Sequence, residues 1–171
     1  MKQARILVFT GDGAGKTSAA LGKVLRLVAR GYRVAIVQFL KHDPDTGEIP
    51  SLVRLGVPVS QCGLGFVPSP SSPHFPQHRA AAQAGLALAE QRLRDVDALV
   101  LDEVCGAIAR GLVAERDVLM LLARLRPGQV CICTGRGASD ALIAAADTVT
   151  RLEAVKHALR SGIPAQEGIE R

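Results

Sequence analysis

Residues 10–18 read TGDGAGKTS, and this glycine-rich stretch lies between an apolar run at residues 6–9 and a segment with helical periodicity. In such a turn, glycines allow successive backbone N–H groups to converge on phosphate oxygens, and the N-terminus of the following helix adds a positive dipole. Lys16 supplies a cation, and the hydroxyl of Thr17 can ligate Mg²⁺. The stretch therefore predicts a phosphate-binding loop between a strand and a helix.

The loop differs from the general pattern GxxxxGK[ST] in its first residues. The first glycine of that pattern would fall at position 10, where this chain has Thr10, so the loop starts at Gly11 and is one residue shorter. Asp12 places a carboxylate beside the expected anion, which is repulsive unless the side chain points away. A glycine-rich turn that binds nothing is the alternative, and the flanking patterns disfavour it. We expect the phosphates to contact Gly11, Asp12, Gly13, Ala14, Gly15, Lys16, Thr17 and Ser18.

The length of the chain predicts a single domain over residues 1–171, with room for one substantial core. Hydrophobic residues make up 48% of the chain but aromatic residues only 3%, so the core is built from aliphatic side chains, which favours α/β packing. No apolar run approaches the roughly 18 residues of a membrane span. Nothing before Ile6 resembles a signal peptide, and we expect a cytoplasmic protein.

The net charge is +5, from 21 basic and 16 acidic residues that are spread along the chain. This balance suits an anionic substrate such as a nucleoside triphosphate. Nucleic-acid-binding proteins more often show clustered basic residues or aromatic residues placed for stacking on bases. We therefore expect no nucleic-acid partner.

The cysteines lack the CxxC spacing of zinc sites and redox dithiols. Cys131 and Cys133 alternate within a strand pattern, so both side chains lie on one face and are expected to pack as small core residues. Cys105 follows an acidic pair, and packing is again the preferred interpretation.

Segments typical of strands and of helices alternate along the rest of the chain. Strands are expected at residues 33–39, 57–61, 97–102, 129–134 and 148–152, and helices at residues 16–30, 82–93, 114–125 and 139–146. Short apolar strands that are linked by helices predict a parallel sheet with helices on both faces and right-handed crossovers.

Two connecting segments interrupt this alternation. Residues 41–50 are polar and contain Asp-Pro and Thr-Gly turn signals, which predict a loop. Residues 62–77 contain Pro68, Pro70, Pro73 and Pro76, which exclude a regular helix or a central strand. We expect a long ordered loop or a mobile lid there. Such a connection is more often functional than not, and a surface excursion is the alternative.

Residues 98–103, ALVLDE, are the expected partner of the phosphate loop. The apolar strand would present Asp102 and Glu103 beside the phosphates, where one or both would hold Mg²⁺ directly or through water. In open α/β sheets the ligand lies at the carboxyl ends of the strands. We therefore expect Gly11, Lys41, Asp102 and Thr134 to converge there.

Arg136 lies just past a predicted strand end on the same rim. A guanidinium group there can bind a phosphate, and an ordinary surface arginine is the alternative. His42, His74 and His78 show no triad or metal spacing and are interpreted as solvated side chains. The residues alone thus indicate a Mg²⁺-nucleotide protein with an unknown second substrate.

The sequence resembles the P-loop corrinoid adenosyltransferases over nearly its whole length. The matching segments, in the order of the family, are TGDGAGKTSAALG, VAIVQFLK, the GxGF piece at residues 63–66, LDEV, RPGQV, TGRGA, AADTV and VKHALRSGIPAQEGIE. The short loop and the C-terminal segment are the most specific of these. The resemblance implies a P-loop NTPase (RecA-like) three-layer fold.

The resemblance also implies transfer of the 5′-deoxyadenosyl group of ATP to Co(I) of a reduced corrinoid, with triphosphate leaving. The phosphate loop, residues 11–18, would hold the triphosphate, and Lys16 would neutralise it. Thr17 and Glu103 would bind Mg²⁺, and Arg136 would help to fix the nucleotide. A flavoprotein or other reductant would supply the electron, and a homodimer is expected.

Phe66 matches an aromatic residue that the family uses as a wedge to remove the axial ligands of Co(II). The family tryptophan two residues later is replaced by Pro68, and the tryptophan after the second strand is missing from residues 41–48. The basic N-terminal extension with which many relatives cover the corrinoid also has no counterpart. These differences concern the corrinoid site, so we expect substrate choice or efficiency to differ from better-known members.

Three other functions are compatible with a phosphate loop. A nucleotide-dependent switch or chaperone-like protein would retain the fold without group transfer. A RecA-like ATPase would release orthophosphate in response to nucleic acid, which the dispersed charge disfavours. A small-molecule kinase would transfer a phosphoryl group from ATP, so a phosphorylated acceptor would have to be found as its product.

Overall fold

A six-stranded parallel sheet forms the centre of the molecule, with the strand order β3-β2-β4-β5-β1-β6. The computed structural model describes residues 3–43, 47–166 and 168–169. The strands are β1 (Arg5–Thr10), β2 (Val34–Gln38), β3 (Val59–Gln61), β4 (Ala98–Asp102), β5 (Val130–Thr134) and β6 (Thr148–Arg151). The helices are α1 (Lys16–Val28), α2 (Glu48–Arg54), α3 (Phe75–Leu93), α4 (Val104–Ala109), α5 (Glu115–Ala123), α6 (Asp140–Ala145) and the 3₁₀ helix η1 (Ala158–Ser161).

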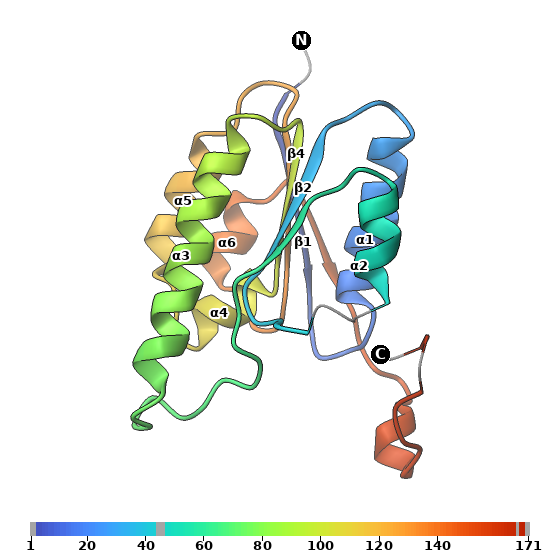
Figure 1. Ribbon diagram of the computed structural model, residues 1–171, viewed down its shortest axis with the longest axis vertical. Coiled ribbons are helices and arrows are strands. Elements are labelled where there is room, and N and C mark those ends of the chain that lie inside the picture. The colour runs from blue at the N-terminus through green and yellow to red at the C-terminus, as the bar shows by residue number, and fades with distance from the viewer. Residues whose placement is uncertain (1–2, 44–46, 167, 170–171) are drawn as a thin grey trace.

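Helices cover the sheet on both faces. Figure 1 shows α1 and α2 on one side of the strands and α3, α4, α5 and α6 on the other. Because the strands are parallel, the loops that follow β1, β2, β4 and β5 all emerge at one edge, and the segment after β6 leaves the molecule there too. The predicted three-layer architecture is confirmed.

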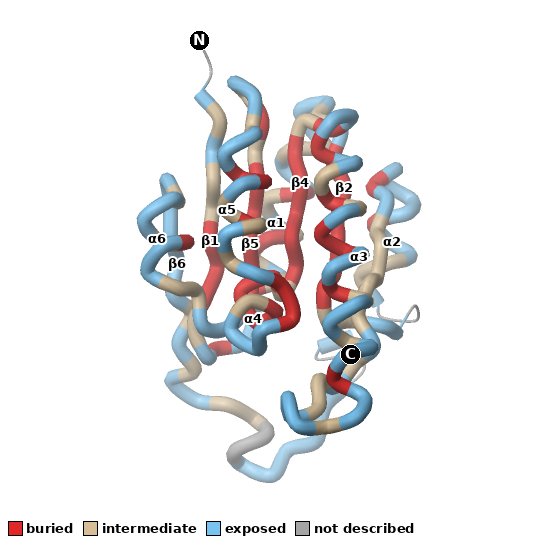
Figure 2. The backbone as a smooth tube through the Cα atoms, turned by 90° about the vertical axis from the view of Figure 1, so that its left-hand side faces the viewer, coloured by how far each residue is buried: buried red, intermediate tan, exposed pale blue. Residues whose placement is uncertain are grey.

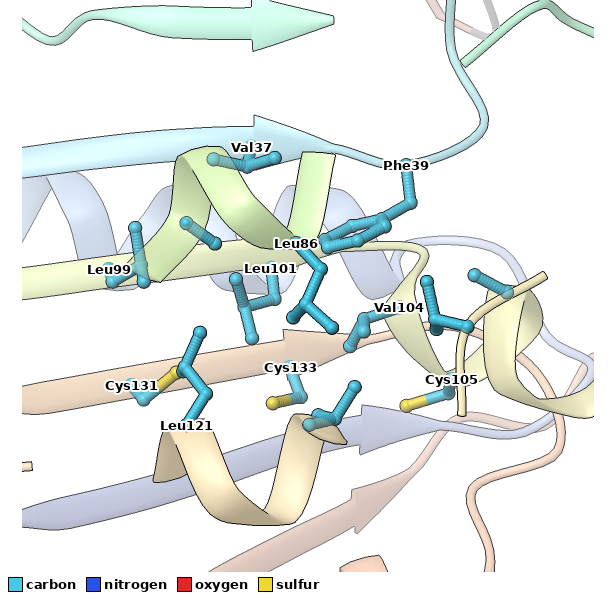
Figure 3. Close-up of a cluster of buried hydrophobic side chains, with 14 of the residues drawn as sticks. Val37, Phe39, Leu86, Leu99, Leu101, Val104, Cys105, Leu121, Cys131 and Cys133 are labelled. Carbon is cyan, nitrogen blue, oxygen red and sulfur yellow. The ribbon is translucent and has the colours of Figure 1, made fainter. Parts of the chain in front are cut away.

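The core is aliphatic and lies on both faces of the central strands. Strands β2 and β4 are buried at every residue, as Figure 2 shows, whereas the edge strand β6 is exposed. Figure 3 shows Cys105, Cys131 and Cys133 within the cluster on the α3 side. Burial raises the pKa of the Cys105 thiol, which keeps it protonated. The interpretation of these three cysteines as packing residues is confirmed.

Helix α2 lies partly within the segment that was predicted to be a polar loop. Residues 44–46 of that segment lie outside the described residues, but α2 begins at Glu48, so the prediction is wrong for residues 48–50. Pro50 is compatible with this helix, because proline is tolerated in the first turn, where its missing N–H has no intrahelical partner. Leu52 is buried and attaches the helix to the sheet.

The proline-rich segment is irregular over residues 62–74, as predicted, but α3 begins at Phe75, so the prediction is wrong for residues 75–77. Pro76 lies in the first turn of that helix, where it is again tolerated. Within the ranges that the structure describes, no helix combines the length and the apolar character needed to cross a bilayer.

Candidate active site

The phosphate loop connects β1 to α1 and is packed against the segment that follows β6. Gly11 and Gly15 have φ values of 99° and 95°, a region that side chains other than glycine rarely adopt. The N–H of Gly13 donates to the carbonyl of Leu152 at 2.9 Å, and a Cβ on Gly13 would lie 2.8 Å from that backbone. The glycines therefore permit both the turn and its close contact with residues 152–153. Asp12 is exposed, so its carboxylate remains hydrated.

The first two residues of α1 connect the loop to the interior of the site. Lys16 is buried, and its Nζ donates to the carbonyl of Gly13 at 2.6 Å. The ammonium group thus lies over the loop. The hydroxyl of Thr17 donates to Oδ1 of Asp102 at 2.9 Å, which joins α1 to the end of β4. Lys16, Thr17 and Asp102 are thereby brought together as predicted.

Asp102 is the centre of a buried polar network. Only 1% of the residue is exposed. Oδ1 accepts hydrogen bonds from Thr17 and from Thr134 at 2.7 Å, and Oδ2 accepts one from Gln38 at 3.1 Å. Nζ of Lys41 lies 3.5 Å from Oδ2. These donors offset the cost of burying a carboxylate and fix the orientation of the Thr17 hydroxyl.

Glu103 follows in an unusual backbone conformation. Its φ is 62°, and among the described residues no other residue except glycine has a positive φ. Its N–H donates to Oγ1 of Thr134 at 2.8 Å, which holds this conformation in place. Burial raises the pKa of Glu103, and the neighbouring Asp102 raises it further. Strain of this kind is concentrated at functional sites.

A cavity of about 510 Å³ opens beside the loop. Its wall includes Lys41, whose Nζ lies 2.6 Å from Oε1 of Glu48 at the start of α2. The ion pair is half-buried. Burial lowers the pKa of Lys41, but the carboxylates of Asp102 and Glu48 outweigh this effect, so the pKa is raised. The lining residues are Ala14, Gly15, Thr17, Ser18, Leu21, Lys41, Gly47, Glu48, Gly168 and Ile169.

Phe66 and Arg136 do not line this cavity. Phe66 is 93% exposed on the loop after β3. Hydrogen bonds attach that loop to the segment at the end of β2, among them one from the N–H of Gly63 to the carbonyl of Lys41 at 3.2 Å and one from the N–H of Gly65 to the carbonyl of Leu40 at 3.1 Å. Arg136 is exposed directly after β5. The site therefore has a polar cavity and, outside it, an exposed aromatic residue.

The oxygen donors at the end of β4 suit a hard divalent cation. Among the described residues there is no cluster of three or more His, Cys, Asp or Glu side chains that could hold a metal. Mg²⁺ commonly uses one or two carboxylates and takes its other ligands from phosphates and water. The hydroxyl of Thr17 with the carboxylates of Asp102 and Glu103 fits that preference.

Sequence reasoning missed Gln38 and Glu48 and gave no role to the side chains of Lys41 and Thr134. Lys41 and Thr134 carried a signal, because both follow predicted strands at the carboxyl edge. Gln38 contacts Asp102 only because β2 and β4 are neighbours in the sheet. Glu48 is the first residue of α2, where the turn signals predicted a loop.

Comparison with known proteins gives a consistent result. A family model described as ATP:corrinoid adenosyltransferase BtuR/CobO/CobP matches residues 2–171. The corrinoid adenosyltransferase of Pseudomonas aeruginosa is 39% identical over 168 residues, which cover 96% of this chain and 82% of that protein. Corrinoid adenosyltransferase CobA of Salmonella typhimurium is 38% identical over 168 residues, with 96% and 84% covered.

Among solved structures, the flagellar accessory protein FlaH from Methanocaldococcus jannaschii superposes with a TM-score of 0.57 at 11% identity, over 88% of this chain and 72% of that one. At this level of identity the likeness concerns the fold alone. It agrees with the three-layer arrangement of a parallel sheet between helices.

Proposed function

The chain belongs to the ATP:corrinoid adenosyltransferase family, and from this premise we propose that the cavity beside the phosphate loop binds the triphosphate of ATP. The family assignment confirms the resemblance that the motifs indicate, and it makes the protein a transferase that moves the adenosyl group of ATP to a corrinoid. The observation that carries the proposal is the bonded set of Thr17, Asp102 and Thr134, which aligns the phosphate loop with the acidic end of β4.

In this proposal the residues of the loop bind the phosphates through backbone N–H groups, and Lys16 neutralises part of their charge. Gly11 and Gly13 shape the loop, and the other loop residues, Asp12, Ala14, Gly15, Thr17 and Ser18, surround the anion. Four of these, Ala14, Gly15, Thr17 and Ser18, line the cavity, which supports the assignment.

Mg²⁺ is proposed to be held by Thr17, Asp102 and Glu103. Both oxygens of Asp102 already accept hydrogen bonds, which favours a role through water, whereas Glu103 is the candidate for direct ligation. When bound, Mg²⁺ would offset the charge of the triphosphate. The Thr134 hydroxyl, which contacts both acidic residues, would keep their relative orientation.

The absence of a catalytic triad from the motifs agrees with the chemistry of the acceptor. Co(I) is itself a strong nucleophile, so the protein has to position C5′ of the ribose, stabilise the leaving triphosphate and exclude water. Phe66 is proposed to contact the corrinoid as the wedge that removes an axial ligand. Its 93% exposure supports that role, because a fully exposed aromatic side chain is available to a partner. Arg136 is proposed to help to fix the nucleotide.

Residues 1–171 are proposed to form one domain, which the family match over residues 2–171 supports. A flavoprotein or other reductant is proposed to generate Co(I). A homodimer is also proposed, because Val155, Ile163 and Ile169 are exposed apolar residues on the segment after β6.

The decisive experiment is an anaerobic incubation with Mg-ATP and chemically reduced cob(I)alamin. Formation of a light-sensitive adenosylcobalamin with an equal amount of triphosphate is the expected result. If no cobalt–carbon bond forms and ATP stays intact or is split to ADP, the proposal is wrong, and a nucleotide-dependent switch or an ATPase explains the fold better.

A further inference from the structure

The cavity has a cation that the pattern of the phosphate loop does not include. Lys41 follows β2, and 28% of its side chain is exposed. Its Nζ lies between Oε1 of Glu48 at 2.6 Å and Oδ2 of Asp102 at 3.5 Å. Lys16 is more deeply buried, and its Nζ is engaged by the carbonyl of Gly13. Within the described part of the cavity wall, Lys41 is therefore the cation that faces the open space.

The balance of charge around the cavity indicates that a bound triphosphate needs a cation such as Lys41. Glu48, Asp102 and Glu103 bring three carboxylates to the site, and these are balanced by the ammonium groups of Lys16 and Lys41 and by the guanidinium group of Arg110, which acts on Glu103. A triphosphate adds several negative charges to this balance. A binding site for it needs cations in contact with the phosphate oxygens, because Coulomb interactions are strong in a partly buried pocket.

We propose that Lys41 binds the triphosphate of ATP, and that Glu48 holds its ammonium group at the cavity wall until the phosphates take the place of the carboxylate. This inference rests on the proposed function, because it takes the cavity as the triphosphate site. The flexible four-carbon stem of lysine lets Nζ change partners without movement of the backbone. Asp102 keeps its hydrogen bonds from Thr17, Thr134 and Gln38 during this exchange.

A purely structural role explains the ion pair less well. Helix α2 is attached to the sheet by the buried side chain of Leu52, so it does not depend on Lys41. Asp102 has three other donors. A role in binding explains why Lys41 lines the same cavity as the phosphate loop.

Calorimetric titration with inorganic tripolyphosphate in magnesium-containing buffer tests the inference directly. We expect Lys41→Met to weaken binding about 10- to 100-fold, because one charge-assisted contact is lost. Glu48→Gln should bind tripolyphosphate as tightly as the unmodified protein or more tightly, because it releases Lys41. Lys23→Met is the matched control, since Lys23 on α1 does not line this cavity, and it should leave binding unchanged.

The outcomes separate the inference from the proposed function. If the unmodified protein does not bind tripolyphosphate, both the triphosphate site and the role of Lys41 are overturned. If it binds and Lys16→Ala abolishes binding while Lys41→Met does not weaken it, the role of Lys41 alone is wrong. If Lys41→Met and Glu48→Gln weaken binding and lower the melting temperature to the same extent, the ion pair is structural and the inference fails.

Discussion

Glu103 combines a proposed role in the site with a backbone conformation that is unfavourable for a residue with a side chain. Its φ of 62° costs a residue with a side chain about 1 kcal/mol, whereas glycine adopts it freely. The hydrogen bond from its N–H to Thr134 holds the strained turn. A conformational cost at this position is explained if the carboxylate is needed next to the phosphate loop.

We therefore expect Glu103→Gly to separate stability from activity. The free energy of unfolding should stay the same or rise by up to about 1 kcal/mol, because the strain is relieved. Adenosyl transfer should fall roughly 100-fold, because a proposed metal ligand is lost. Denaturant unfolding and the cob(I)alamin assay measure the two effects. Glu103→Gln, which keeps the strain but removes a carboxylate whose charge burial and Asp102 disfavour, should lose activity and gain less stability than Glu103→Gly. A loss of stability in Glu103→Gly would contradict this account.

At the residue scale, the residues that the sequence nominates for the candidate site are those that lie within motifs. Lys16 and Thr17 belong to the loop pattern, and Asp102 with Glu103 ends an apolar strand. Gln38 could not be assigned, because its contact with Asp102 depends on β2 lying next to β4, and the order of strands in a sheet is not written in the spacing of residues.

At the scale of elements, the strands, the long helices and the short helix α6 were predictable, and the short helices α2 and α4 were not. An apolar run bounded by turn residues identifies a buried strand, and a helix of thirteen residues such as α1 repeats its periodicity several times. Helices α2 and α4 have seven and six residues, less than two full turns of pattern. Pro76 was interpreted as a break because a first-turn proline and a helix-breaking proline look alike in a sequence, and the Asp-Pro and Thr-Gly turn signals led to the prediction of a loop where α2 begins.

Two helical glycines are expected to respond in opposite ways to alanine. A Cβ on Gly22 in α1 would meet nothing within 4 Å, so Gly22→Ala should raise the free energy of unfolding by about 0.5–1 kcal/mol. A Cβ on Gly85 in α3 would lie 2.9 Å from Cβ of Cys62, so Gly85→Ala should lower it by about 1–3 kcal/mol. Urea unfolding of both variants measures the difference. Equal stabilisation by the two changes would mean that α3 does not pack closely on Cys62.

The amino ends of β2 and β4 are joined by an ion pair with a predictable pH response. The guanidinium group of Arg33 donates to both carboxylate oxygens of Asp97 at 3.1 Å and lowers the pKa of Asp97 from 3.8 to about 2. A lowered pKa stabilises the folded protein above the unfolded pKa, and that contribution is lost as the pH falls through the folded value.

The stability difference between the unmodified protein and Asp97→Asn should therefore be constant above about pH 4 and shrink between pH 4 and pH 2. Urea midpoints across this range measure it. Arg33→Gln should give a profile of the same direction and smaller amplitude, because it removes the guanidinium group but keeps the backbone N–H of residue 33, which donates to Oδ2 of Asp97 at 2.9 Å. A difference that persists unchanged at the lowest pH would show that the carboxylate stabilises the protein by something other than its charge.

At the scale of the whole molecule, the parallel sheet places two different surfaces at one edge. The polar cavity lies between the phosphate loop, Lys41 and α2, and the exposed Phe66 lies on the loop after β3, tied to the end of β2. Because Phe66 contributes nothing to the cavity wall, binding of the nucleotide and activation of the corrinoid should be separable by mutation.

Phe66→Ala is the variant that makes this separation. Saturation with Mg-ATP at about 100 times Kd should stabilise the variant and the unmodified protein equally, by about 2.7 kcal/mol, since the cavity is intact. With Co(II) and a reductase the variant should lose most of its activity, and with preformed Co(I) it should lose much less, because only the first assay requires removal of the axial ligand. Equal losses in the two assays would rule out a wedge, and a loss of nucleotide stabilisation would mean that the loop after β3 belongs to the nucleotide site instead.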